Sequence, residues 1–203
     1  MSLLKHAAPL LAGFLMTTTA QASPQIGKPA PDFFAVDSNG KAVKLSDYRG
    51  NIVVLEWTND GCPYVQKHYS SGNMQKLQKD ETAKGIVWLT IISSAPGEQG
   101  YVKGAEANEL TKSRSAAPTA VLLDPDGKVG HLYDARTTPH MFIVNGDGTL
   151  VYMGGIDSKP TANLADIKTA KNYVRAALDE VMEGKPVGDA VTRPYGCSVK
   201  YRS

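Results

Sequence analysis

Two short apolar runs with a helical stretch between them most constrain how this chain can fold. Residues 52–58 (IVVLEWT) and 86–93 (IVWLTIIS) are rich in β-branched and other apolar side chains, which is typical of buried strands. Residues 63–84 between them follow a helical pattern, with a predicted break near residues 71–73. The order strand, helix, strand, followed by a hairpin and a final helix, indicates a mixed α/β domain.

The remaining elements are short and separated by turns. Residues 163–184 are predicted to form one helix, because their apolar positions recur at spacings of three and four. Those positions are Val174, Ala177, Leu178, Val181 and Met182. The pattern also predicts, in chain order, a hairpin at 32–45, a turn or single helical turn at 46–50, a partial helix within 98–115, a strand at 119–124 and a hairpin of strands 140–145 and 150–155.

The first 22 residues have the three-part layout of a secretory signal. A start with one lysine and no acid is followed by an apolar run at 7–16 and by Ala20-Gln21-Ala22, with small residues where a signal peptidase reads. The apolar run is too short to span a bilayer, and a buried N-terminal helix is the alternative. We expect a mature chain that starts at Ser23 and is periplasmic or secreted, where disulfides persist.

Length and composition fit one domain with a tail. The chain has 203 residues and 42% hydrophobic content, enough for one core. We expect residues 23–184 to form the domain and residues 185–203 to form a C-terminal tail that carries Cys197. The net charge of +2 gives no basis for a nucleic-acid partner, and no segment after the signal is suited to cross a membrane. No residues have the spacing of a zinc site, so we expect no metal and no cofactor.

Cys62 is the first candidate for a catalytic residue. It follows the strand at 52–58 and precedes Pro63, and proline is favoured at the first helical position because its missing N–H costs no hydrogen bond there. Cys62 is therefore predicted to cap the helix, with its sulfur near unpaired N–H groups and the positive end of the helix dipole. That environment lowers a thiol pKa and makes the thiolate available as a nucleophile. A half-buried structural cysteine is the alternative.

Pro139 is the second candidate, within residues 136–144 (RTTPHMFIV). Proline cannot donate to a sheet ladder, so it belongs at the start of the strand that follows. The Thr138–Pro139 bond is either an ordinary trans bond or a special cis bond. The low frequency of cis bonds before proline, about 5–6%, favours trans.

Together these segments resemble the thioredoxin fold. More narrowly they resemble the redoxins related to peroxiredoxins, the alkyl hydroperoxide reductase and thiol-specific antioxidant family. GCPYV at 61–65 and TTPHMFIV at 137–144 carry the likeness, and IGKPAPDFF at 26–34 followed by LSDYRG at 45–50 matches the start of that family. The resemblance covers residues 26–183. It implies a thioredoxin-like three-layer sandwich, in which a central mixed sheet is flanked by helices and preceded by an N-terminal hairpin.

The resemblance also implies positions for the site residues. Cys62 occupies the reactive-cysteine position, and Pro139 occupies the position of a cis-proline that faces it. Thr138 offers backbone groups to a bound substrate at that place. The sequence departs from the thioredoxin motif Cys-x-x-Cys, because Asn59 and Val65 stand three residues to either side of Cys62.

Two further motifs of the related families are also altered. Peroxiredoxins carry Pro-x-x-x-Thr/Ser-x-x-Cys, and Leu55 and Asn59 occupy the Pro and Thr/Ser positions here. Asn59 is able to donate a hydrogen bond to a peroxide through its amide, so Asn59 and Pro63 join Thr138 and Pro139 as candidate substrate-supporting residues. Copper-binding relatives carry Cys-x-x-x-Cys, and Gln66 stands where their second cysteine would be.

Cys197, in the tail segment RPYGCSVKY, is the second candidate for a catalytic residue. Three interpretations stay open. It resolves oxidised Cys62, since recovery of an oxidised thiol requires a second thiol; it forms a static disulfide with Cys62; or it pairs with another molecule. Among the histidines, His68 is expected on a different helical face from Cys62 and at the surface, and His140 either approaches the site or points away.

The leading hypothesis is an exported thiol-dependent oxidoreductase of the redoxin type. Cys62 attacks a peroxide or a protein or small-molecule disulfide, Cys197 resolves the product, and an external dithiol reduces the enzyme again. The alternative is a non-catalytic binding protein with a structural Cys62–Cys197 disulfide. A metal carrier ranks lowest, because the ligand spacing is missing.

Overall fold

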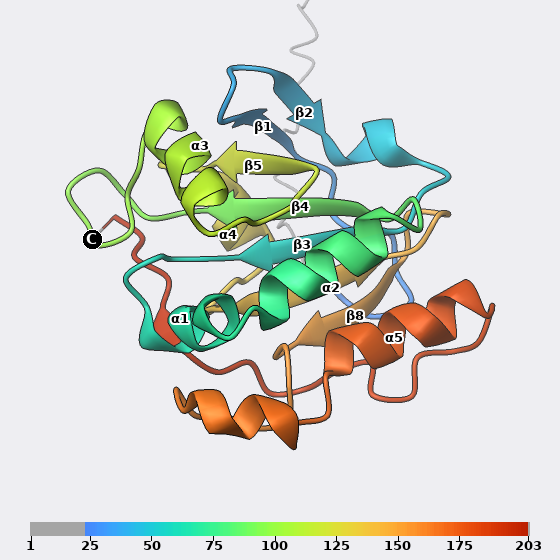
Figure 1. Ribbon diagram of the computed structural model, residues 1–203. Helices are drawn as coiled ribbons and strands as arrows, with labels where there is room; N and C mark the ends of the chain where they lie inside the picture. Colours follow the sequence, from blue (N-terminus) through green and yellow to red (C-terminus); the bar gives the residue numbers. More distant parts are fainter. Residues whose placement is uncertain (1–22, 203) are drawn as a thin grey trace, which may run out of the picture.

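The structure is a computed structural model, and it describes residues 23–202. The predicted secretory signal at residues 1–22 lies outside these described residues. The chain has the predicted α/β architecture, with a seven-stranded mixed sheet between helices and a separate two-stranded sheet at one end (Figure 1).

The strands agree closely with the sequence pattern. In chain order the large sheet contains β1 (Phe34–Asp37), β2 (Ala42–Lys44), β3 (Val53–Trp57), β4 (Val87–Ile92), β5 (Ala120–Leu123), β7 (His140–Val144) and β8 (Leu150–Gly154). Their spatial order is β2-β1-β5-β4-β3-β7-β8. The central strands β3, β4 and β5 are parallel, whereas β1, β2, β7 and β8 run antiparallel to their neighbours. The small sheet pairs β6 (Thr137–Thr138) with β9 (Cys197–Ser198).

Helices cover the two faces of the sheet unequally. One face carries α1 (Pro63–Ser70), α2 (Asn73–Thr82), α3 (Gly104–Ser113) and α5 (Tyr173–Met182) (Figure 1). The other face carries α4 (Lys128–Leu132), the 3₁₀ turn η1 (Leu45–Tyr48) and the N-terminal segment. The predicted break between α1 and α2 is confirmed. It falls at Gly72, whose φ of 74° is a left-handed conformation that glycine adopts without strain.

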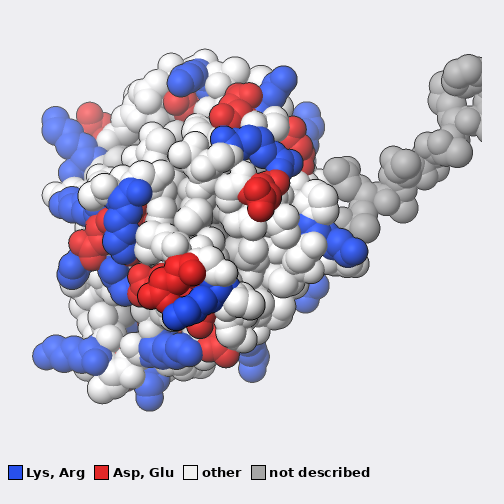
Figure 2. Space-filling view, turned by 90° about the vertical axis from the view of Figure 1, so that its right-hand side faces the viewer, with Lys and Arg blue, Asp and Glu red and all other residues white. Residues whose placement is uncertain are grey.

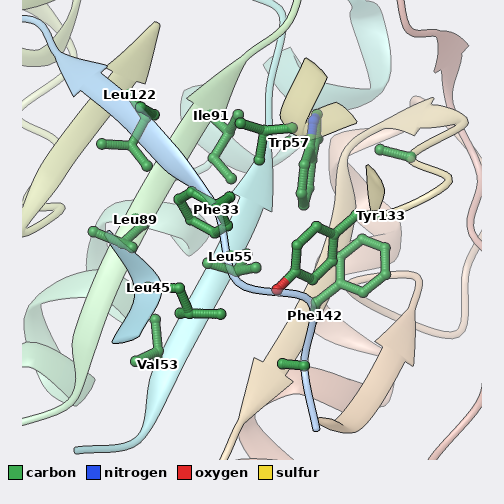
Figure 3. Close-up of a cluster of buried hydrophobic side chains, with 14 of the residues drawn as sticks. Phe33, Leu45, Val53, Leu55, Trp57, Leu89, Ile91, Leu122, Tyr133 and Phe142 are labelled. Carbon is green, nitrogen blue, oxygen red and sulfur yellow. The ribbon is translucent and has the colours of Figure 1, made fainter. Parts of the chain in front are cut away.

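Alternate residues of the central strands build the core on the α4 face. Leu55 and Trp57 of β3 point there together with Leu89 of β4, and Phe33 and Tyr133 close over them (Figure 3). The Trp57 ring lies 5.2 Å from that of Phe142 and 5.5 Å from that of Tyr133, at the separations aromatic pairs prefer. The period of two along β3 therefore directs its side chains to both faces of the sheet.

The opposite face of the sheet packs against α1, α2 and α5. Val54 of β3 and Trp88 of β4 meet Val65 of α1 and Leu77 of α2, all nearly or fully buried. Cys62 belongs to this cluster. Because α1 lies directly on the sheet, the end of β3 and the start of α1 are held rigidly with respect to each other.

The helix predicted at residues 163–184 is wrong in one respect. The segment forms the 3₁₀ turn η2 (Leu164–Lys168) and then α5, with a break between them. Lys171 is engaged with another segment, because its carbonyl accepts from the Ser158 N–H at 3.0 Å. Asn172 then caps α5 by accepting from the Arg175 N–H at 2.9 Å. Met182, one of the apolar positions of that helical pattern, is 40% exposed at the helix end.

The short helix α4 and the pairing of the tail with the rest of the domain were not predicted. With five residues, α4 is too short to show a periodic pattern. The tail passes below β8 and α5 to reach α1 (Figure 1). Along the way the Thr192 N–H donates to the carbonyl of Met153 in β8 at 3.1 Å, and β9 pairs with β6. Near the end of the tail, the Lys200 carbonyl accepts from the Ala95 N–H at 2.8 Å.

The surface carries charges of both signs. Figure 2 shows acidic and basic side chains interspersed on the face it presents, with no broad region of a single sign. Among residues 23–202, no helix combines the length and the apolar character needed to cross a bilayer.

Candidate active site

Cys62 lies at the N-terminus of α1, as predicted. Its backbone is extended, with φ −82° and ψ 122°, and Pro63 occupies the first helical position behind it. The Cys62 N–H donates to the Asn59 carbonyl at 3.1 Å, which closes the turn between β3 and α1. The side chain is fully buried.

Asn59 uses both ends of its amide to hold this turn. Its Oδ1 accepts from the Gly61 N–H at 2.9 Å, and its Nδ2 donates to the Gln99 carbonyl at 3.1 Å. Gly100 packs so closely that a Cβ there would overlap the Asn59 side chain, and its φ of 83° is also left-handed. Asn59 is therefore committed to the loop around the cysteine, and both ends of its amide are engaged.

The segment Thr138–Pro139 faces the cysteine from the other side. The bond is cis, so the resemblance indicated the isomer correctly and the frequency of trans bonds did not. The Cys62 thiol donates to the Thr138 carbonyl at 3.1 Å. Thr138 is 2% exposed, and its hydroxyl has no hydrogen-bond partner in the described part of the chain.

The tail brings Cys197 to the same place. Cys197 lies opposite Thr138 in the β6–β9 pair, and its thiol lies close enough to that of Cys62 to shift its pKa. Gly196 makes this approach possible, because a Cβ there would overlap the Thr138 carbonyl oxygen and its φ is 138°. Both cysteines are free thiols in the structure, with Cys62 buried and Cys197 partly exposed.

The two thiols have different acidities. Burial raises the pKa of Cys62, but hydrogen bonds from the Cys197 thiol and from the backbone N–H groups of Val65 and Cys197 lower it by more. The net pKa of Cys62 lies below that of an ordinary thiol, which fits the predicted helix-capping environment. Burial, together with the hydrogen bond and negative charge of Cys62, raises the pKa of Cys197 to about 11. The proton therefore leaves Cys62 first.

A buried carboxyl group lies six residues before the cysteine. Glu56 of β3 is fully buried and accepts hydrogen bonds from Tyr69, Gln78, Trp88 and Thr90. Burial raises its pKa, although these four donors lower it in part. Glu56 was not predicted as a site residue. The signal was present, because it is the one charged residue in the apolar run 52–58.

The histidines do not join the thiols. His68 was predicted to be a surface residue, which is wrong: it is fully buried, and its Nε2 lies 3.1 Å from the Tyr195 hydroxyl. The tail covers the face of α1 that would otherwise be exposed. His140 points to the opposite face of the sheet, with its ring 4.5 Å from that of Phe142. Burial lowers the pKa of both histidines to about 4.

No cluster in residues 23–202 contains three or more His, Cys, Asp or Glu side chains in a metal-binding arrangement. The main polar cluster near α1 is instead formed by Lys67, His68, Asp157 and Tyr195. Apart from His68, these residues had no signal in the sequence analysis, because they come from three distant segments.

Known proteins similar to this chain carry thiol chemistry. The model of the AhpC/TSA family matches residues 26–153. The chain is 29% identical over 126 residues to the thiol-disulfide oxidoreductase ResA of Bacillus subtilis (strain 168), covering 62% of this chain and 64% of that protein. It is 25% identical over 119 residues to the peroxiredoxin Bcp of the same organism, covering 54% of this chain and 64% of that protein. The chain thus spans slightly less than two thirds of these relatives.

A solved structure matches more of the chain. The crystal structure of an uncharacterized conserved protein from Geobacillus kaustophilus superposes with a TM-score of 0.73 and 27% sequence identity. The match covers 88% of this chain and 93% of that one. The likeness therefore extends beyond residues 26–153.

Proposed function

Because the chain belongs to the AhpC/TSA family, we propose that it is a thiol-dependent oxidoreductase in which Cys62 and Cys197 form one redox pair. One observation carries the proposal: β9 pairs with β6, and this pairing sets the Cys197 thiol against the more acidic thiol of Cys62. Two thiols of unequal acidity in contact can form and release a disulfide without a third cysteine.

Disulfide exchange is the reaction we propose first. The Cys62 thiolate attacks one sulfur of a substrate disulfide, so that a mixed disulfide forms and the other substrate sulfur leaves and takes up a proton. Cys197 then loses its proton and attacks the Cys62 sulfur. The second substrate thiol is released, and the Cys62–Cys197 disulfide remains. Thr138 and Pro139 support the exchanging sulfurs, and Pro63 fixes the start of α1 beneath them.

An external dithiol closes the cycle. Its thiolate attacks the disulfide at Cys197, the more exposed sulfur, and Cys62 leaves as the thiolate of lower pKa. The second thiol of the reductant then attacks the mixed disulfide and frees Cys197, which takes a proton. Two electrons thus pass from the dithiol to the substrate disulfide.

Peroxide reduction is a second candidate, favoured by the complete burial of Cys62. A small peroxide needs less displacement of the tail than a protein disulfide does. The Cys62 thiolate would attack one oxygen, the O–O bond would break, and the other oxygen would take up a proton and leave as water or an alcohol. The resulting sulfenic acid would condense with the Cys197 thiol to form the disulfide and release water. The engagement of both ends of the Asn59 amide weighs against this candidate, because Asn59 stands where peroxiredoxins carry Thr or Ser.

Cysteine variants test the proposal in two parallel assays. Wild type, Cys62→Ser and Cys197→Ser are compared for reduction of a protein disulfide and for consumption of hydrogen peroxide, with dithiothreitol as the reductant. We expect Cys62→Ser to lose activity in the productive assay. Cys197→Ser should react once and accumulate as a species oxidised at Cys62 when the reductant is left out. Unchanged rates of Cys62→Ser in both assays would refute the proposal.

A non-catalytic protein with a structural disulfide predicts a different result. Such a disulfide would resist reduction until the protein unfolds, as is typical of structural disulfides with potentials below about −300 mV.

We further propose that the protein acts after export, in an oxidising compartment, on the basis of the signal-like residues 1–22. N-terminal sequencing of the protein from the periplasm tests this, and an N-terminus at Ser23 is expected.

A further inference from the structure

A buried cluster of charged and polar groups lies beneath the tail, outside the thiol pair. Lys67 and His68 of α1 are fully buried, and Asp157 after β8 and Tyr195 in the tail are 3% and 7% exposed. Lys67 Nζ lies 3.1 Å from Asp157 Oδ2 and donates to the Lys159 carbonyl at 2.7 Å. A buried ion pair is a weak source of stability, because desolvation offsets most of the attraction. Stability alone therefore does not explain why these charged groups are buried here.

Tyr195 is the tail residue that is hydrogen-bonded to this cluster. Its hydroxyl donates to Asp157, lies 3.1 Å from His68 Nε2 and accepts from Lys67 at 3.3 Å. Its ring packs edge-on against Tyr64 at 5.9 Å. Three of these partners belong to α1, so Tyr195 ties the tail to one helix.

The same helix carries Cys62, and the same tail carries Cys197. Cys62 is the N-cap residue of α1, and Cys197 follows Tyr195 by two residues. Gly196, the residue between them, is packed against the Thr138 carbonyl. The Tyr195 hydroxyl and the Cys197 sulfur are thus placed by one short, tightly packed segment.

We propose that Tyr195 is a positioning residue, which the cluster of Lys67, His68 and Asp157 holds so that Cys197 stays against Cys62. Positioning raises the effective concentration of one thiol at the other, and this quantity sets the stability of a disulfide relative to external thiols. The inference rests on the proposed redox pair. It adds a residue, Tyr195, whose hydroxyl bonds to Asp157, His68 and Lys67 and governs the equilibrium between the two sulfurs.

The equilibrium with glutathione measures this effect directly. Reduced protein and glutathione disulfide form the Cys62–Cys197 disulfide and two molecules of glutathione, so two electrons leave the cysteine pair and the equilibrium constant is an effective concentration. The oxidised fraction is read after acid quenching and alkylation with a maleimide that shifts the band of the reduced protein on a gel.

Tyr195→Phe is the main variant. Phenylalanine keeps the ring contact with Tyr64 and leaves the Lys67–Asp157 pair in place, so the fold is retained. We expect the equilibrium constant to fall about tenfold, the effect of losing a hydrogen bond to a charged group.

Tyr133→Phe is the matched control. Tyr133 is also buried, at 1% exposure, and its hydroxyl donates to the Pro31 carbonyl at 2.7 Å, away from the thiols. This variant should lose thermal stability and keep the wild-type equilibrium constant. A Tyr195→Phe protein that behaves like this control would overturn the positioning role and leave the redox pair intact. A wild type that forms no Cys62–Cys197 disulfide at any glutathione ratio would overturn the proposed function, and this inference with it.

Discussion

Replacing Glu56 by Gln should change how the stability of this protein depends on pH. The carboxyl group is fully buried, and its Oε1 accepts from Tyr69 at 2.8 Å. Its Oε2 accepts from Trp88 at 2.7 Å, Gln78 at 3.0 Å and Thr90 at 3.1 Å. Glutamine has the shape of the protonated acid and cannot ionise, so the variant isolates the contribution of ionisation.

The direction of the effect follows from the pKa. Burial raises the pKa of Glu56 above its ordinary 4.5, and the four donors offset this only in part. From about pH 4.5 upwards the unfolded chain releases the proton that the folded protein still holds. The free energy of unfolding therefore falls with rising pH, by at most about 1.4 kcal/mol per pH unit, until the folded-state pKa is passed. Glu56→Gln lacks this decline.

The hydrogen bonds of residue 56 determine the difference in free energy of unfolding between Glu56→Gln and wild type at low pH. If the glutamine oxygen takes the place of Oε2, it still accepts from three donors, and only the bond to Tyr69 is altered. One altered hydrogen bond costs about 0.5–1.5 kcal/mol. We expect Glu56→Gln to be less stable than wild type by about 1 kcal/mol near pH 4, with the difference shrinking and then reversing as the pH rises.

Denaturation by urea at a series of pH values between about 4 and 8 measures the difference, since the other titrating groups cancel between the two proteins. Glu98→Gln, at an exposed position, is the control and should give a curve parallel to that of wild type. If Glu56→Gln also runs parallel to wild type over the whole range, the reasoning about burial and the raised pKa is wrong.

Two further predictions concern the contact between the tail and the cysteine. Gly196→Ala should separate β9 from β6, because its Cβ overlaps the Thr138 carbonyl, and alkylation of Cys62 by iodoacetamide should become about tenfold faster. Gly184→Ala, where a Cβ meets no atom, is the control and should keep the wild-type rate. Equal alkylation rates in Gly196→Ala and wild type would contradict the view that the tail covers Cys62. Cys197→Ala should raise the pKa of Cys62, because the hydrogen bond from the Cys197 thiol is lost while the backbone N–H groups of residues 65 and 197 remain. Thiolate absorbance near 240 nm follows the titration, and an unchanged pKa would assign the low value to the backbone N–H groups alone.

Much of the fold could be predicted from the sequence because its signals are local. The apolar run at 52–58 and the Cys62–Pro63 pair contain, within a dozen residues, the strand, the turn and the helix start. Gly72 marks the helix break by its backbone freedom alone. Where the prediction failed, as at Lys171, the cause was a long-range contact, since its carbonyl pairs with the Ser158 N–H.

Only part of the candidate site could be predicted from the sequence. Cys62, Thr138 and Pro139 were placed by motif and resemblance, whereas no local pattern indicates that Cys197 pairs with Thr138. The error over His68 has the same origin. A helix position is predicted to be exposed when no later element in the pattern covers it, and the segment that covers His68 has no periodicity of its own.

The position of the tail bears on how a substrate reaches the thiol. By resemblance, Thr138 offers its backbone to a substrate, and here β9 already pairs with that residue. On the proposed function, the protein thus holds its own second cysteine at the place proposed for an incoming polypeptide. The β6–β9 ladder is only two residues long, whereas Tyr195 is held by several buried partners. On the proposed mechanism a substrate therefore displaces the short ladder first, while Tyr195 keeps the tail in reach, so that Cys197 returns to Cys62 once the mixed disulfide has formed.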